Sequence, residues 1–163
     1  MSAPSHPYLC RHAAICMVID MEHYRLGELK VGMEKQFPVI ITEEKMRMFM
    51  EISGDINPLH IYDVFAQRHG FPSRVVYGML TAAFYSTLAG VYLPGERCLL
   101  YEVDTKFMKP VIFSEGETLN VWGRVEEVDE LRGYIRLKAK VRNSKGETVS
   151  RAKIMAGVLK DGA

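Results

Sequence analysis

The chain has 163 residues, of which 48% are hydrophobic and 25% are charged, as expected of one globular domain with a substantial core. Its formal net charge of +1 gives no reason to expect nucleic acid or an anionic membrane as a partner. The apolar stretches are too short to span a bilayer. We therefore expect a soluble, cytoplasmic protein that binds neither nucleic acid nor membrane.

Residues 1–22 differ from the rest of the chain, because they carry two prolines and show no sustained periodicity. We expect an N-terminal arm here, either disordered or lying upstream of the natural start, since Met17 and Met21 are both possible initiators. The remaining residues, 23–163, are expected to form a single domain.

The three cysteines, Cys10, Cys16 and Cys98, are an odd number without repeated spacing, which argues against a disulfide framework. His6 and His12 lie close to the first two cysteines and complete a set of four possible zinc ligands. This set lacks the paired Cys-x-x-Cys form of most structural zinc sites. We expect no metal and no cofactor.

The domain begins with a predicted strand over residues 36–42, which is rich in β-branched side chains. Thr42 is then a suitable N-cap, and two glutamates follow it in the first helical turn. Apolar residues recur at helical spacing as far as residue 53, so residues 42–53 are predicted to form an amphipathic helix. A second helix is expected over residues 58–68, with Ile61, Val64 and Phe65 facing inward.

Residues 78–93 are apolar on nearly every side of a helix, which is typical of a buried helix. Small residues within it, Ala82, Ala83, Ala89 and Gly90, are expected to let a sheet approach closely.

From residue 97 onward the chain alternates between apolar and polar residues in long segments. Strands are predicted over residues 99–107, 118–128, 134–141 and 148–159, with glycine-containing turns between the later ones. Short turns between successive strands favour an antiparallel, strongly curved sheet. The predicted class is therefore α+β, with the sheet wrapped around one long buried helix.

The most informative segment is Ser-Gly-Asp-Ile-Asn-Pro-Leu-His, residues 53–60. Asn57 and Pro58 suit the cap and first position of a short helix, and this pattern alone is often nothing more than a helix start. Asp55 and His60, five positions apart, could however share one water molecule across the bend. A carboxylate and an imidazole on one water are suited to acid–base chemistry near neutral pH.

This octapeptide, followed by Ala66, Phe71 and the Tyr-Gly-Met-Leu of residues 77–80, resembles the MaoC-like (R)-specific enoyl-CoA hydratase and dehydratase family. Residues 107–111 and 115–119 resemble a later, less specific region of the same family. The resemblance covers residues 37–159 and implies a hotdog fold, a curved antiparallel sheet around a long central helix.

The resemblance also implies an activity and a site. Family members add water to trans-2-enoyl thioesters of coenzyme A, giving (R)-3-hydroxyacyl thioesters, or catalyse the reverse dehydration. Asp55 and His60 would be the catalytic pair, the backbone N–H of Gly78 would form the oxyanion hole, and Asn57 would position the substrate or its loop. Tyr77 departs from the family, where histidine is frequent at this position.

Several points remain open at this stage. The alternatives to a hydratase are a hotdog acyl thioesterase and a non-catalytic module that binds acyl thioesters. The substrate could be carried by coenzyme A or by an acyl carrier protein, and either member of the Asp55–His60 pair could be the base. A homodimer or higher homo-oligomer is expected, because one curved sheet of this size leaves edges and a face uncovered.

Overall fold

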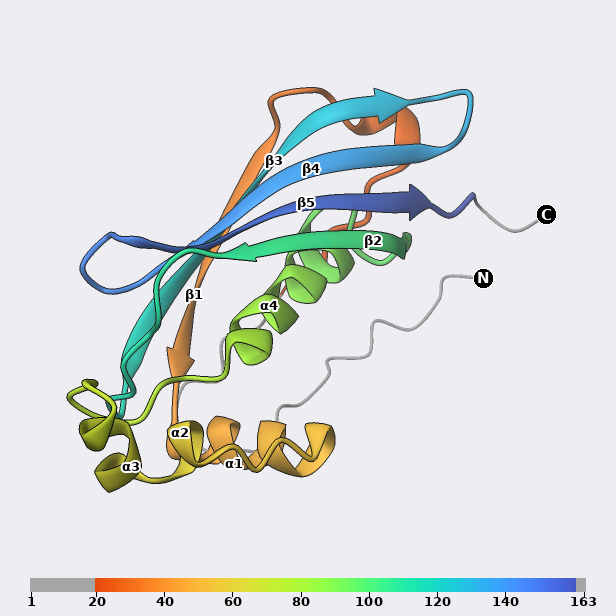
Figure 1. Ribbon diagram of the computed structural model, residues 1–163. Helices are drawn as coiled ribbons and strands as arrows, with labels where there is room; N and C mark the ends of the chain where they lie inside the picture. The colour runs from red at the N-terminus through yellow and green to blue at the C-terminus, as the bar shows by residue number, and fades with distance from the viewer. Residues whose placement is uncertain (1–19, 161–163) are drawn as a thin grey trace.

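The computed structural model describes residues 20–160, which form one curved sheet and a layer of helices (Figure 1). All five strands are antiparallel, in the order β1-β3-β4-β5-β2. Their bounds are β1 Glu34–Ile41, β2 Cys98–Phe107, β3 Glu117–Asp129, β4 Tyr134–Arg142 and β5 Thr148–Val158. The four strands predicted after residue 97 are confirmed to within one residue at each end, and β1 starts two residues earlier than predicted.

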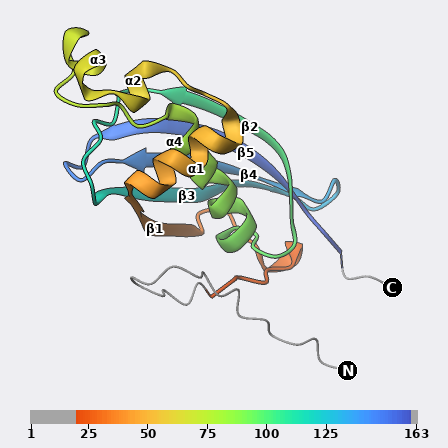
Figure 2. The same ribbon diagram turned by 90° about the horizontal axis from the view of Figure 1, so that it is seen from below.

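The helices lie on one side of this sheet (Figures 1 and 2). They are η1 Leu26–Glu28, α1 Glu43–Ser53, α2 Pro58–Ile61, α3 Asp63–Arg68 and α4 Gly78–Thr87, and α4 continues into a π-helical turn, η2 Leu88–Tyr92. Thr42 caps α1 by accepting a hydrogen bond from the Lys45 N–H at 3.2 Å, as predicted. A curved antiparallel sheet around a central helix is the hotdog fold, so the predicted α+β class is confirmed.

The sheet comes very close to the central helix at Gly123 of β3. A Cβ atom at this position would lie 2.4 Å from Cδ2 of Leu88, well inside contact distance. The glycine that permits the close approach therefore lies in the sheet. The prediction for the helix was wrong at Gly90, where a Cβ atom would meet nothing within 4 Å, and at Ala83, which is exposed.

The central helix is also less enclosed than its composition suggested. Met79 is 62% exposed, and Ser86 also faces outward, because the sheet of one chain covers only one side of α4. On the sheet side, the hydroxyl groups of Tyr85 and Ser150 lie 2.8 Å apart and are both fully buried. Burial raises the pKa of Tyr85 to about 12, so its phenol stays protonated.

The single helix predicted over residues 58–68 was wrong. Tyr62 adopts an extended conformation with φ −120° and ψ 117°, which separates α2 from α3. The break rotates the second segment, so that Val64 is 59% exposed and Ala66 is fully buried instead.

The N-terminal residues 1–19, with the four possible zinc ligands and Met17, lie outside the described residues. Glu22 is described: its N–H donates to the Val91 carbonyl at 2.9 Å, and its carboxylate pairs with Lys35. The division between an arm and a domain near residue 22 stays a prediction. Within residues 20–160, no helix is both long enough and apolar enough to cross a membrane.

Candidate active site

The loop between α1 and α2 is shaped by hydrogen bonds from two Asx side chains. Gly54 ends α1 in the left-handed conformation, with φ 70°. The Asp55 carboxylate then accepts the N–H of Asn57 at 3.0 Å, and the Asn57 side chain accepts the N–H of Leu59 at 3.0 Å. The predicted N-cap at Asn57 is therefore confirmed, with Pro58 at the first position of α2.

His60 lies in α2 and is held by a backbone carbonyl that the sequence did not point to. Its Nδ1 lies 2.7 Å from the carbonyl oxygen of Val75. A carbonyl only accepts hydrogen bonds, so Nδ1 must carry a proton. In the neutral imidazole, Nε2 is then left with its lone pair available as an acceptor. The backbone thus selects the tautomer of His60 that can take a proton at Nε2.

Tyr77, which precedes α4, contacts both members of the predicted pair. Its ring packs against that of His60, with 4.2 Å between ring centroids, and its hydroxyl group donates to the Asp55 carbonyl at 3.0 Å. Tyr77 is only 2% exposed. Burial, and then the nearby charge of Asp55, raises its pKa, so the phenol remains a donor. From the sequence, Tyr77 was expected to belong to the family motif of residues 77–80 while departing from the histidine frequent at this position, and no contact with Asp55 or His60 was predicted.

Asp55 and His60 do not touch each other directly. Their side chains share no hydrogen bond or ion pair in the described structure, and Asp55 is exposed while His60 is half-buried. One carboxylate oxygen of Asp55 accepts the N–H of Asn57. The other has no hydrogen-bond partner within residues 20–160. Both side chains therefore keep an acceptor that a water molecule could use.

Gly78 begins α4, where the first backbone N–H groups have no carbonyl four residues earlier in the helix. Thr81 is the first to make such a bond, from its N–H to the Tyr77 carbonyl at 3.2 Å. Its hydroxyl group also donates to the Gly78 carbonyl at 2.6 Å. Within residues 20–160, no acceptor contacts the N–H of Gly78 itself. The positive end of the α4 dipole lies at the same point.

His60 and Gly78 line one pocket of about 310 Å³. Its remaining lining is mostly apolar and comes from α4, β5 and the segments around residues 75 and 107–111. Phe107 closes it near Gly78, since a Cβ atom on Gly78 would lie 3.3 Å from the Phe107 ring. Asp55 and Asn57 do not line this pocket. Asp55 is connected to it by the hydrogen bond from Tyr77 to its carbonyl, and Asn57 by capping α2, which carries His60.

Two basic residues in or next to the segments that line the pocket are engaged with carboxylates. Arg74 donates to both oxygens of Glu43, at 3.1 and 2.6 Å, and its N–H and guanidinium also meet Asp63. Lys109 lines the pocket but pairs with Glu147 at 2.5 Å. Sequence reasoning did not identify the Val75 carbonyl or the Tyr77 ring as contacts of His60, because neither contact has a pattern of its own in one sequence.

Comparison with known sequences identifies a family and several relatives of this chain. A family model described as a MaoC-like domain matches residues 27–150. A 3-hydroxybutyryl-CoA dehydratase from Methylorubrum extorquens is 32% identical over 121 residues, covering 74% of this chain and 76% of that protein. An (R)-specific enoyl-CoA hydratase from Rhodospirillum rubrum is 32% identical over 99 residues, covering 61% of this chain and 68% of that protein.

Solved structures show the same fold. An unliganded R-hydratase from Pseudomonas aeruginosa aligns with a TM-score of 0.76 at 27% identity, over 83% of this chain and 86% of that one. The (R)-hydratase from Aeromonas caviae aligns with a TM-score of 0.75 at 25% identity, over 80% and 97%. This chain therefore belongs to the MaoC-like domain family and is an enzyme of the hydratase and dehydratase type.

Proposed function

We propose that the protein adds water to a trans-2-enoyl thioester, carried by coenzyme A or by a carrier protein, and forms an (R)-3-hydroxyacyl thioester. It also catalyses the reverse dehydration. The observation that carries this proposal is the pocket in which His60, with Nε2 available as an acceptor, lies together with the unpartnered N–H of Gly78. The relatives named as enoyl-CoA hydratase and 3-hydroxybutyryl-CoA dehydratase support the same reaction.

The attacking water is held by two acceptors. Its two O–H groups donate to Nε2 of His60 and to the unpartnered carboxylate oxygen of Asp55, which leaves an oxygen lone pair directed at C3 of the substrate. As the water oxygen bonds to C3, one of its protons passes to this pair. A proton is then returned to C2, so that water has been added across the double bond. The two groups act as a coupled pair in this scheme.

The thioester oxygen gains negative charge as the C3–O bond forms, because the π electrons move towards the carbonyl. The N–H of Gly78, at the positive end of α4, is suited to stabilise that charge. Donors of this kind act in the transition state more than in the ground state, so they lower the barrier to reaction. Asn57 keeps the loop in shape by capping α2, and its neutral amide is not an acid or base near neutral pH.

We also propose that the enzyme is a homodimer. Strand β2 is an edge strand paired only with β5, and five of its apolar side chains are between 37% and 54% exposed: Leu99, Leu100, Tyr101, Val103 and Phe107. A long, apolar, unpaired edge is a site for pairing with another strand. A second copy of the chain, related by a twofold axis, would cover both β2 and the exposed Met79 side of α4.

The reaction is tested by following the enoyl-thioester absorbance with crotonyl-CoA and identifying the configuration of the product. We expect His60→Gln to lower kcat at least about a hundredfold. The matched control is His69→Gln, because Nδ1 of His69 also meets a backbone carbonyl, that of Phe65 at 2.8 Å, but the residue is exposed and outside the pocket. Release of free thiol from crotonyl-CoA together with crotonate, and without a 3-hydroxyacyl thioester product, would instead identify a thioesterase.

A further inference from the structure

Residues 73–77, here called the strap, connect the layer of α1, α2 and α3 with Gly78 at the start of α4 (Figure 1). The strap pairs with residues 111–113 through an isolated antiparallel bridge between Val75 and Ile112. Two backbone hydrogen bonds, of 2.7 and 2.8 Å, flank this bridge. The backbone of the strap is therefore fixed on one side.

On its other side, the strap meets the segments that carry Asp55 and His60. The N–H of Val75 donates to the Leu59 carbonyl of α2 at 3.1 Å, and the Val75 carbonyl lies 2.7 Å from Nδ1 of His60. The Tyr77 hydroxyl group donates to the Asp55 carbonyl at 3.0 Å. One short segment thus contacts both members of the proposed catalytic pair.

Arg74 connects the strap to the two other helices of the layer. Its guanidinium donates to both carboxylate oxygens of Glu43, the first residue of α1, at 3.1 and 2.6 Å. Its backbone N–H donates to the carboxylate of Asp63, the first residue of α3, at 2.9 Å, and the Ser73 hydroxyl group donates to the same oxygen at 2.8 Å. The guanidinium also lies 4.6 Å from the centroid of the Phe113 ring. Arg74 therefore ties the starts of α1 and α3 to the strap.

This contact differs from an ordinary surface ion pair. The side chain of Arg74 is only 16% exposed, whereas both side chains of the Arg47–Glu51 pair on α1 are more than half exposed. Hydrogen bonds from Arg74 lower the pKa of Glu43 and the pKa of Asp63, so both carboxylates stay ionised. A forked, mostly buried arginine contact fixes geometry, while an exposed pair contributes little.

The position of Arg74 gives it leverage on the site. Helix α1 has 11 residues and is about 16 Å long. Arg74 holds its first residue, and Tyr77 holds Asp55, two residues after its last. Helix α3 begins two residues after α2 ends, so the contact with Asp63 also restrains α2 and His60. A displacement of about 1 Å in a catalytic group can lower turnover as much as a hundredfold.

We propose that Arg74 is a positioning residue for the reaction. By tying α1 and α3 to the strap, it keeps the Val75 carbonyl on Nδ1 of His60, which leaves Nε2 available to accept a proton. Arg74 does not line the pocket and acts only through His60. The proposal rests on the proposed function for its effect on turnover, whereas its effect on the tautomer of His60 can be measured without catalysis.

The tautomer of His60 is read from long-range proton–nitrogen NMR spectra of the full-length protein at about pH 8.5, where an ordinary imidazole is neutral. The chain has five histidines, and the signals of His60 are those lost in His60→Gln. We expect the wild type to show the form protonated at Nδ1, and Arg74→Met to show a mixture with the form protonated at Nε2. Arg74→Lys keeps the charge but not the fork, so its spectrum should lie between the two.

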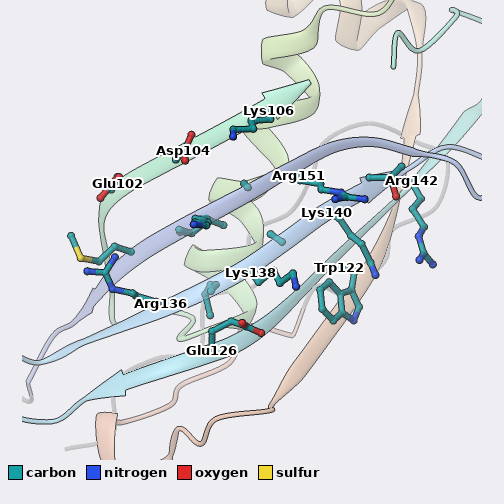
Figure 3. Close-up of a pocket in the computed structure, with 17 residues that line it drawn as sticks. Glu102, Asp104, Lys106, Trp122, Glu126, Arg136, Lys138, Lys140, Arg142 and Arg151 are labelled. Atoms are coloured by element: carbon teal, nitrogen blue, oxygen red, sulfur yellow. The ribbon is translucent and has the colours of Figure 1, made fainter. Parts of the chain in front are cut away.

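Hydration of crotonyl-CoA provides a second arm. Arg74→Met should lower kcat about tenfold and leave KM within about twofold of the wild type, because this residue does not touch the substrate. The matched control is Arg136→Met. Arg136 also pairs with a glutamate, Glu127 at 3.1 Å, and lies 5.4 Å from the centroid of the Tyr134 ring, but it lines the hollow on the face of the sheet that points away from α4 (Figure 3). The control should change neither the tautomer nor kcat.

If Arg74→Met does not fold, Glu43→Gln tests the same contact from the other side, and it should shift the tautomer in the same direction. The proposal is overturned if these variants keep the wild-type tautomer, or if Arg136→Met changes the tautomer as much. It is also overturned if loss of folded protein in urea unfolding accounts for the whole loss of kcat, because the role would then be merely structural. A wild type that does not hydrate crotonyl-CoA would contradict the proposed function, while the NMR spectra would still decide the role of Arg74.

Discussion

Replacing Gly78 by alanine tests the proposed oxyanion site, because the new methyl group lies next to the N–H that is proposed to meet the substrate oxygen. Its Cβ atom would lie 3.3 Å from Cε1 and 3.4 Å from Cζ of Phe107. These contacts are short by only a few tenths of an ångström, so a small shift of the Phe107 side chain is enough to relieve them. Alanine is also the better helix former at this position. The free energy of unfolding should therefore change by less than about 1 kcal/mol.

The activity should respond very differently. The methyl group and the displaced ring occupy the space beside the N–H of Gly78, so the thioester oxygen can no longer meet this donor. Loss of one such donor lowers kcat by roughly 10²- to 10³-fold. The control is Gly90→Ala, since a Cβ atom at Gly90 would meet nothing within 4 Å. Steady-state hydration of crotonyl-CoA and urea unfolding measure the two effects. A Gly78→Ala enzyme with wild-type kcat would refute the role of this amide.

Three further predictions concern the interior. Gly123→Ala should destabilise the protein by about 1–3 kcal/mol in urea unfolding, because its Cβ atom would lie 2.4 Å from Leu88; unchanged stability would mean that the helix is not held this close to the sheet. The free energy of unfolding should fall as the pH rises from 10 towards 12, because the pKa of Tyr85 is about 12 in the folded protein and 10 when unperturbed. Tyr85→Phe should reduce that slope, and an unchanged slope would contradict the burial of this phenol. Tyr77→Phe should lower kcat about tenfold with little effect on KM or on the free energy of unfolding. The ring still packs on His60, but the loop loses its hydrogen bond from the Tyr77 hydroxyl group. A loss of unfolding free energy as large as the loss in activation free energy would indicate a purely structural role.

Local chemistry explains which parts of the fold could be predicted from one sequence. Strands β3, β4 and β5 alternate between buried and outward residues over much of their length, and the caps at Thr42 and Asn57 are side-chain interactions within three residues of the chain. Such features do not depend on distant neighbours. The break at Tyr62 does, because it lets Ala66 rather than Val64 pack into the core, and nothing in the local pattern distinguishes the two.

The candidate site also combines residues that could be predicted from the sequence with contacts that could not. Asp55, His60 and Gly78 could be named because they belong to short motifs within the chain. The groups that orient them come from other segments: the Val75 carbonyl selects the tautomer of His60, and the Phe107 ring limits the space at Gly78. These contacts span 15 residues in one case and join different elements in the other. Only the three-dimensional structure brings them together.

The central claim is that Asp55 and His60 hold one water molecule between them, and a double-mutant cycle on hydration measures this most directly. Rates are compared for the wild type, Asp55→Asn, His60→Gln and the double variant, with crotonyl-CoA at saturation. Two groups that act on the same water should each lower kcat at least about a hundredfold, and the double variant should be scarcely slower than either single one. Near wild-type hydration by both single variants, or losses that simply multiply in the double variant, would contradict the account.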